Sequence, residues 1–229
     1  MIIDCISDLH GETPRLEGGD LLIVAGDMTA RDEIPGWKRF FDWFKAQDYR
    51  KKIYIGGNHD VLLSQCLSSE QARIMDLFDE STEFAEYLCD SSTDFEGLKI
   101  WGAPWTWRFF GINPDCTAFT FQSRNDLKEK WELIPDDTDI LVTHGPPNGI
   151  LDKSEYSERF GCNHLTNAVM KLPNLKLHVF GHIHEGHGQT KEYQGRWDSE
   201  PTELMHLSVN CAHMDGYYNP VNKPIRVVL

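Results

Sequence analysis

Several features that mark special classes of protein are absent from this sequence. Its 229 residues contain no repeat, no low-complexity segment and no apolar run near the ~20 residues that a membrane-spanning helix needs. Lysine and arginine number 22 against 36 aspartates and glutamates, and they form no basic block, so the formal net charge is −14. We therefore expect neither a membrane partner nor electrostatic binding to duplex nucleic acid.

Cysteine is also sparse, and its spacing follows no known pairing motif. The six cysteines are scattered, and no two of them form a C-x-x-C pattern. In a chain of this length they indicate reduced, mostly buried thiols rather than a disulfide framework. The chain begins MIIDCISDLHG, with an acidic residue at position 4, and this stretch is not the apolar segment of a secretory signal. Both observations favour a cytoplasmic protein.

The sequence does contain a regular alternation of short apolar runs and polar turns. The runs predict strands at residues 2–7, 20–26, 51–57, 98–104, 139–145, 175–181, 203–209 and 224–229. Several are almost continuously hydrophobic, which is typical of strands covered on both faces. Helical spacing of apolar residues predicts helices over 35–47, 68–78 and 162–172. No linker divides the chain, so we predict a single α/β domain over residues 1–229, with mixed sheets and flanking helices.

Polar residues gather where five of these strands end. Aspartate, asparagine or histidine follows each strand, usually beside glycine; the residues are Asp8, His10, Asp27, Asn58, His59, Asp60, His144, His182 and His184. Ligands of open α/β sheets bind at the carboxyl ends of the strands, and residues two apart on a strand point to the same side. A single histidine at a strand end is more often structural. Five such ends together predict a binding site.

The donor atoms at these strand ends suit metal ions. They come from two carboxylates, one amide and four imidazoles: Asp8, Asp27, Asn58, His10, His144, His182 and His184. That is too many for one zinc ion with an open position, which takes about three protein ligands. The set fits two metal ions that share a carboxylate and clamp a phosphoryl group. Nitrogen and oxygen donors without thiolate suit Mn²⁺, Fe, Zn²⁺, Co²⁺ or Ni²⁺.

The order of these motifs (D-x-H, G-D, G-N-H-D, T-H-G and G-H-x-H) resembles that of the calcineurin-like metallophosphoesterase superfamily. Further stretches are similar to one branch, the small metallophosphoesterase domain-containing phosphodiesterases, at 97–105, 143–152, 179–188 and 219–227. The resemblance implies a four-layer α/β sandwich of two central mixed sheets flanked by helices. It also implies two divalent ions at the edge of the sheets, with Mn²⁺ or Fe favoured.

The resemblance implies a role for each matched residue. One metal ion would be held by Asp8, His10, Asp27 and His184, and the other by Asp27, Asn58, His144 and His182. Asp27 would thus bridge the two ions, and a hydroxide between them would attack phosphorus. His59 would donate a proton or a hydrogen bond to the leaving oxygen. Asp60 is expected either to orient the His59 ring or to be a solvated turn carboxylate.

The substrate suggested by the resemblance is a small phosphodiester. Protein phosphatases carry a phosphate-binding arginine before their G-N-H motif, and this chain has Gly56 at that position. Loss of that arginine favours a diester, which has less charge to neutralise, and we expect a cyclic nucleotide of the 2′,3′ or 3′,5′ type. A phosphomonoesterase or protein phosphatase of the same superfamily is the alternative. A non-catalytic interaction protein on this fold is a further one.

The segment WGAPWTWRFFG at 101–111 is rich in aromatic residues. It is expected either to wall the active-site cleft or to pack in the core beneath a loop. In the first case Trp105 or Trp107 would stack on a base, with Arg108 nearby. Three weaker candidates lie elsewhere, at His187, Asn210 and His213. Nothing in the sequence indicates an oligomeric state.

Overall fold

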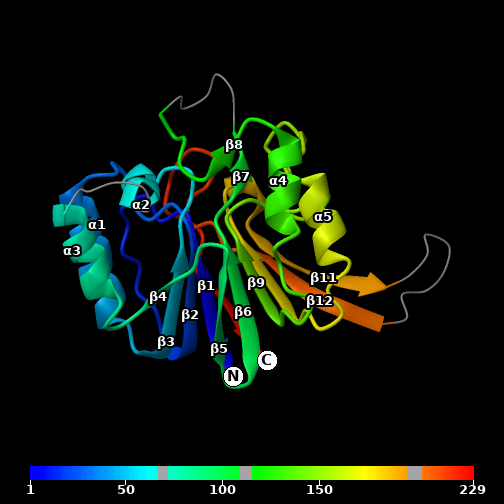
Figure 1. The fold of residues 1–229 in the computed structure, drawn as a ribbon, viewed down its shortest axis with the longest axis horizontal. Coiled ribbons are helices and arrows are strands. Elements are labelled where there is room, and N and C mark those ends of the chain that lie inside the picture. Colours follow the sequence, from blue (N-terminus) through cyan, green and yellow to red (C-terminus); the bar gives the residue numbers. More distant parts are fainter. Residues whose placement is uncertain (67–71, 109–114, 195–202) are drawn as a thin grey trace.

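Two central β-sheets pack face to face, and helices cover their outer sides, so that the molecule has four layers (Figure 1). The computed structural model describes residues 1–66, 72–108, 115–194 and 203–229. Both sheets contain parallel and antiparallel strand pairs. The prediction of an α/β sandwich with two mixed sheets is therefore confirmed.

The first sheet is mostly parallel. Its strands are β1 (Ile2–Ile6), β2 (Gly19–Ala25), β3 (Tyr49–Ile55), β4 (Glu86–Tyr87) and β13 (Ile225–Val228). They lie in the order β13-β1-β2-β3-β4, and only β13 runs antiparallel to its neighbour. The carboxyl ends of β1, β2 and β3 consequently meet at one edge of the sheet.

The second sheet has a parallel centre and antiparallel edges. Its strands are β5 (Ser91–Phe95), β6 (Leu98–Ala103), β9 (Ile140–Thr143), β10 (Leu177–Phe180), β11 (Gly188–Gln194) and β12 (Glu203–Asn210). They lie in the order β11-β12-β10-β9-β6-β5. A separate pair joins β7 (Thr106–Trp107) to β8 (Thr120–Phe121). All eight predicted strands are present, with ends within two residues of the predicted ones.

Alternate residues of the two sheets form the core between them. Ile3, Ile23 and Ile55 from the first sheet pack with Val142 and Val179 from the second, and all five are fully buried. Burying a side chain of this size contributes about 1.5–3 kcal/mol. Because the same residues join the sheets just below their carboxyl ends, the loops that follow the strands are held in a fixed arrangement.

The helices agree with the predictions in position more than in length. Helix α1 (Ile34–Ala46) has its proline in the first turn and buries Trp37, Phe40, Phe41 and Phe44 against the first sheet. Helix α3 (Ala72–Ser81) replaces the prediction over 68–78, of which residues 68–71 lie outside the described part of the chain. Helix α5 (Asn163–Val169) is shorter than the predicted 162–172.

Several short or polar elements have no counterpart in the predictions. They include helices α2 (Val61–Cys66) and α4 (Arg124–Trp131), the 3-10 turn η1 (His184–Gly186), and the edge strands β5 and β11. Helix α4 is capped by Ser123, whose side chain accepts a hydrogen bond from the Asn125 amide, and among its described side chains only Leu127 and Trp131 are buried. One apolar pair gives too weak a periodic signal to predict a helix.

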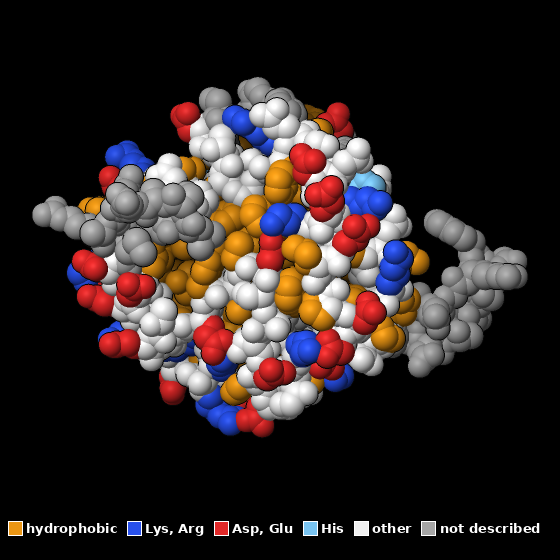
Figure 2. Space-filling model, viewed as in Figure 1, with side chains coloured by type: hydrophobic (Ala, Val, Ile, Leu, Met, Phe, Trp, Pro, Cys, Tyr) orange, Lys and Arg blue, Asp and Glu red, His pale blue; other side chains and the backbone are white. Residues whose placement is uncertain are grey.

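No helix in the described part of the chain is both long and apolar enough to cross a lipid bilayer. On the face that Figure 2 shows, lysine and arginine side chains are interspersed with aspartate and glutamate over the coloured residues. This agrees with a sequence in which basic residues form no block.

Two buried histidines lie on the outer face of the second sheet, on the side away from the inter-sheet core. His178 bonds to Thr143 Oγ1 through Nε2, at 2.9 Å, and its Nδ1 has no hydrogen-bond partner among the described residues. Neither ring nitrogen of His206 has one. Burial lowers the pKa of His206 to about 4 and that of His178 well below its usual value. Both imidazoles are therefore neutral in the folded protein near pH 7.

The neutral state of these histidines predicts a loss of stability in mild acid. In the unfolded chain they titrate near pH 6.5, so between about pH 6.5 and 4 the unfolded state binds more protons, and stability falls as the pH drops. His206→Gln should reduce the slope of the free energy of unfolding against pH by up to ~1 kcal/mol per pH unit below pH 6. Urea unfolding of the metal-free proteins at pH 7.5 and 5 measures it. Equal losses in the two proteins would contradict the prediction.

Candidate metal centre

The ends of five strands meet at one edge of the two sheets, and they bring all seven predicted ligands together. Asp8 and His10 follow β1, Asp27 follows β2, and Asn58 follows β3; from the second sheet, His144 follows β9, while His182 and His184 follow β10. Six of the seven are buried, with at most 9% of their surface exposed, and His182 is partly buried. The site thus straddles the seam between the sheets.

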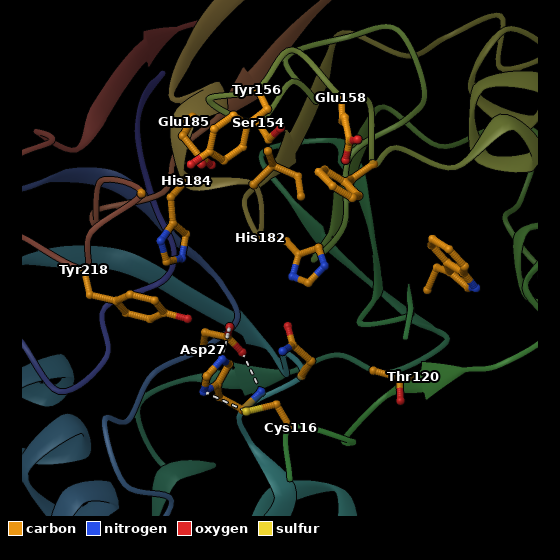
Figure 3. A pocket seen from close by; sticks show the side chains of 16 residues that line it. Asp27, Cys116, Thr120, Ser154, Tyr156, Glu158, His182, His184, Glu185 and Tyr218 are labelled. Carbon is orange, nitrogen blue, oxygen red and sulfur yellow. Dashed lines mark hydrogen bonds and ion pairs between the residues drawn. The ribbon is translucent and has the colours of Figure 1, made fainter. Parts of the chain in front are cut away.

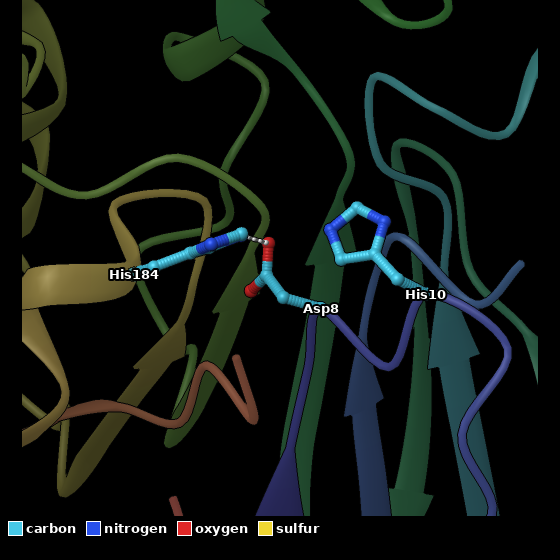
Figure 4. A group of neighbouring side chains, drawn as sticks. All are labelled: Asp8, His10 and His184. Carbon is cyan, nitrogen blue, oxygen red and sulfur yellow. Dashed lines mark ion pairs between the residues drawn. The ribbon is translucent and has the colours of Figure 1, made fainter. Parts of the chain in front are cut away.

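The first group of donors consists of Asp8, His10 and His184, whose nearest ligand atoms all lie within 4.8 Å of one another (Figure 4). Asp8 Oδ1 and His184 Nε2 are 3.3 Å apart. The Asp8 carboxylate also accepts hydrogen bonds from the Ser7 hydroxyl and the His182 amide. These bonds fix a carboxylate from one sheet against a loop from the other.

The second group consists of Asp27, His144 and His182, again with ligand atoms within 4.8 Å of one another. His144 Nε2 lies 3.4 Å from Asp27 Oδ2 and 2.9 Å from Asn58 Oδ1. The same oxygen of Asp27 lies 4.0 Å from His10 Nε2, which belongs to the first group. Asp27 therefore stands between the two groups, and it forms a third group of possible ligands with His10 and His59.

The outer nitrogens of two imidazoles are held by backbone carbonyls. His144 Nδ1 donates to Ala25 O at 2.8 Å, and His184 Nδ1 donates to Asp215 O at 3.0 Å. A carbonyl oxygen can only accept, so Nδ1 carries the proton and Nε2 is turned inward. His10 Nε2 is buried and has no hydrogen-bond partner within the described residues. Inward-facing imidazole nitrogens beside two buried carboxylates are the surroundings that a divalent cation requires.

The backbone of the site is strained at four of the seven ligands. Asp8, His10, Asp27 and His182 have φ angles of 51°, 43°, 57° and 67°. Holding a residue with a side chain in this left-handed region costs roughly 1–2 kcal/mol of conformational free energy. Such strain persists only where the surrounding structure enforces it. The neighbouring Gly26 has no room for a side chain, because a Cβ there would lie 2.5 Å from His144 Nδ1.

Asp60 supports this strained backbone, and neither role expected for it is correct. Its carboxylate is fully buried and accepts hydrogen bonds from three backbone amides, those of Asp27 and Gly57 at 2.8 Å and of Met28 at 3.1 Å. It is neither a solvated turn residue nor bonded to the His59 ring. Asp60 instead ties the turn after β3 to the turn after β2, and so positions Asp27.

The charges of the site are set by burial and by the pairing of carboxylates with imidazoles. Burial alone would raise the pKa of Asp8, but its hydrogen bond with His184 lowers it. Burial lowers the pKa of His10 to about 4, so this ring is neutral near pH 7. For His144, burial is outweighed by the Asp27 carboxylate, which raises the pKa to about 9. A cation that binds there must displace that proton.

A cavity of about 390 Å³ opens onto the metal-ligand candidates (Figure 3). Asp27, Asn58, His59, His182 and His184 form its inner wall. The aromatic residues that line it are Trp107, Tyr156, Phe160 and Tyr218, and Tyr218 also packs edge-on against the rings of His10 and His184. Sequence reasoning missed Tyr218, Tyr156 and Phe160, because no motif marks them.

The two predicted stacking tryptophans lie in different surroundings. Trp107 lines the cavity. Trp105 packs against Phe119 and Phe121, and its Nε1 donates to Asp90 Oδ1 at 2.6 Å. It is therefore a packing residue, which corrects its expected place in the cleft. Arg108 is not among the described residues that line the cavity, and residues 109–111 of the aromatic segment lie outside the described part of the chain.

The three weaker candidates hold loops around the site. Asn210 Nδ2 donates to the carbonyls of Ile183, which lines the cavity, and of Leu151. His213 Nδ1 bonds to Asn222 O at 2.7 Å, and His187 Nε2 bonds to Lys223 O at 3.0 Å. The bonds of these histidines fix the segment that carries Asp215 and Tyr218.

Comparison with known proteins agrees with this geometry. A family model described as calcineurin-like phosphoesterase matches residues 1–186, which include all seven ligand candidates. The chain is 35% identical to the human metallophosphoesterase domain-containing protein 1, over 98% of this chain and 70% of that protein. It is 35% identical to a UPF0046 protein of Caenorhabditis elegans, over 96% of this chain and 58% of that protein. The crystal structure of TT1561 from Thermus thermophilus is similar in fold, with a TM-score of 0.58 at 18% identity over 91% of this chain and 88% of that one.

Proposed function

Because the chain belongs to the calcineurin-like phosphoesterase family, whose members are hydrolases of phosphoesters, we propose that it is a phosphodiesterase with two divalent metal ions. The observation that carries the proposal is the position of Asp27. Its Oδ2 lies 4.0 Å from His10 Nε2 in one donor group and 3.4 Å from His144 Nε2 in the other. A carboxylate that lies between two sets of imidazoles is well placed to be a ligand shared by two cations.

Seven residues would hold the ions, which we propose to be Mn²⁺ or Fe. The proposed ligands are Asp8, His10, Asp27 and His184 for one ion, and Asp27, Asn58, His144 and His182 for the other. When bound, the ions would lower the pKa of water and neutralise charge on the phosphoryl oxygens. The chain supplies the rigid frame, because the inter-sheet core and Asp60 hold the ligands in place before substrate arrives.

His59 is the proposed donor to the leaving oxygen. Its ring lines the cavity, and its Nε2 lies 3.9 Å from Asp27 Oδ2, so this edge of the imidazole faces the ligand groups. Its backbone amide donates to Asp27 Oδ1 at 2.9 Å, which fixes the residue beside the shared carboxylate. A donor in this position stabilises the charge that develops on a leaving oxygen.

Gly56 supports a diester as substrate. A Cβ at this position would lie 2.2 Å from the ring of Phe119, so no arginine side chain can extend from residue 56 into the site. No lysine or arginine is among the described residues that line the cavity. A diester carries one negative charge less than a dianionic monoester and needs less compensation. The volume and Trp107 suit a nucleoside-sized group, so we propose a 2′,3′- or 3′,5′-cyclic nucleotide as substrate.

Purified protein is expected to contain about two divalent ions per chain, because two groups of donors lie on either side of Asp27. Elemental analysis after purification without chelators measures the number. Chelation should abolish hydrolysis, and Mn²⁺ should restore it. Full activity with a single ion per chain would contradict the dinuclear site. A folded protein that binds no metal would favour the non-catalytic alternative.

Diesters are expected to be hydrolysed faster than monoesters, because the cavity wall offers no described cationic side chain for a second phosphate charge. A panel with Mn²⁺ should compare bis-p-nitrophenyl phosphate, p-nitrophenyl phosphate, 2′,3′- and 3′,5′-cyclic nucleotides and a short oligonucleotide. We expect the cyclic nucleotides to give the highest kcat/KM. If the monoester is hydrolysed ten times faster than every diester, the protein is a phosphomonoesterase and the interpretation of Gly56 is wrong.

A further inference from the structure

Cys116 lies against the proposed donor His59, although 57 positions separate them in the chain. Its Sγ is 3.3 Å from His59 Nδ1, and both side chains line the cavity (Figure 3). In the sequence this cysteine is one of six scattered thiols, and no motif marks it.

The loop that carries Cys116 is built onto the turn that carries His59. The amide of Ala118 donates to Asn58 O at 3.2 Å, one residue before His59. The ring of Phe119 covers Gly56, at the start of the same turn. The position of the thiol is therefore set by backbone bonding and packing of the residues that follow it, and the contact does not depend on the thiol alone.

The two ring nitrogens of His59 face different surroundings. Nδ1 meets the Cys116 thiol, whereas Nε2 is turned toward Asp27 Oδ2, at 3.9 Å. The His10 ring packs edge-on against His59, with centroids 4.7 Å apart. The imidazole is thus held between an aromatic edge, a thiol and the shared carboxylate.

A neutral imidazole carries one proton, and the partner of one nitrogen decides which nitrogen carries it. Burial raises the pKa of the Cys116 thiol to about 11, so near pH 7 the sulfur has a proton to donate. An S–H group that donates to Nδ1 leaves the ring proton on Nε2. That nitrogen is the one that faces the ligand groups.

We propose that Cys116 is a positioning residue, whose S–H donates to Nδ1 of His59 and thereby keeps on Nε2 the hydrogen that is offered to the leaving oxygen. No proton is transferred between the two residues in this arrangement. The proposal rests on the role proposed for His59, and it adds a residue that no motif of the chain marks.

The tautomer of His59 tests the proposal without any activity. The metal-free protein, labelled with ¹⁵N at histidine and studied above pH 7.5, should show the Nε2–H form of His59 in the wild type and in Cys116→Ser, which keeps a donor. Cys116→Ala should show a mixture of the two tautomers. An unchanged tautomer in Cys116→Ala would overturn the proposal, even if the protein hydrolyses diesters as expected.

Kinetics with matched leaving groups give the second readout. Cys116→Ala should lower kcat about tenfold on a diester with an alkoxide leaving group, and little on bis-p-nitrophenyl phosphate, whose leaving group needs no donor. Cys116→Ser should retain most of the rate. In a His59→Ala background, Cys116→Ala should have no further effect, and an additional tenfold loss there would overturn the proposal. A wild-type protein inactive on every diester would refute the proposed function and leave the tautomer result standing.

Discussion

Replacing Asp27 with asparagine or alanine is expected to abolish nearly all turnover. The Oδ2 atom of Asp27 lies within 4.0 Å of imidazole nitrogens from both donor groups, so its loss removes the ligand that the two ions would share. A bound metal ion contributes several kcal/mol to stabilising charge at the reaction centre, so losing the ligand that holds it should lower kcat/KM by ~10³-fold or more. Elemental analysis should show fewer than two ions per chain.

Asparagine is the more informative of the two substitutions. Asp27 has a φ of 57°, and asparagine tolerates this left-handed conformation better than alanine does. Asp27→Asn also keeps an oxygen that can accept from the His59 amide. Asp137→Asn is a matched control, because Asp137 is an exposed carboxylate paired with Lys99 and should not affect the rate. Wild-type metal content and turnover in Asp27→Asn would exclude a bridging role.

Replacing His59 with alanine is expected to slow hydrolysis by roughly 10²–10⁴-fold while leaving metal binding intact. The ring contacts Cys116 on one side and faces Asp27 on the other, but the seven proposed ligands do not include it. The loss should be large for a diester with an alkoxide leaving group and small for bis-p-nitrophenyl phosphate. Steady-state kinetics on both substrates, with elemental analysis of each variant, measure the effect.

A second histidine provides the control for this variant. His164 lies on α5, on the outer side of the second sheet, and lines a separate surface pocket away from the cavity. His164→Ala should keep both the rate and the metal content. If His59→Ala instead empties the site of metal, then His59 is a ligand and its proposed role is wrong.

The frame of the protein could be predicted from the sequence because its strands are covered on both faces. Such strands appear as short apolar runs, and their positions came within two residues of the observed ends. The polar residues that follow them are of few chemical types, and parallel strands bring their carboxyl ends to one edge. Asp8 and Asp27, which follow neighbouring parallel strands of the first sheet, could therefore be assigned to one site without knowing how the sheets pack.

Elements with little buried apolar surface escaped prediction. Helix α4 buries only Leu127 and Trp131 among the side chains that the structure describes, and the edge strand β11 (GQTKEYQ) is polar throughout most of its length. Their conformations depend on capping and on pairing with a neighbouring strand, which a window of sequence does not contain. The same is true of β5, whose sequence SSTDF resembles a loop until it pairs with β6.

The sequence by itself determined the eight apolar strands of the two sheets and the polar side chains that follow five of them. The tertiary structure alone decided what surrounds those side chains. It placed Asp60 against three backbone amides and Cys116 against His59, and it put Trp107 in the cavity while the partly buried Trp105 packs against Phe121. The reason is physical: periodicity records how a residue meets its own strand or helix, whereas these contacts join segments that meet only when the two sheets and their loops pack together.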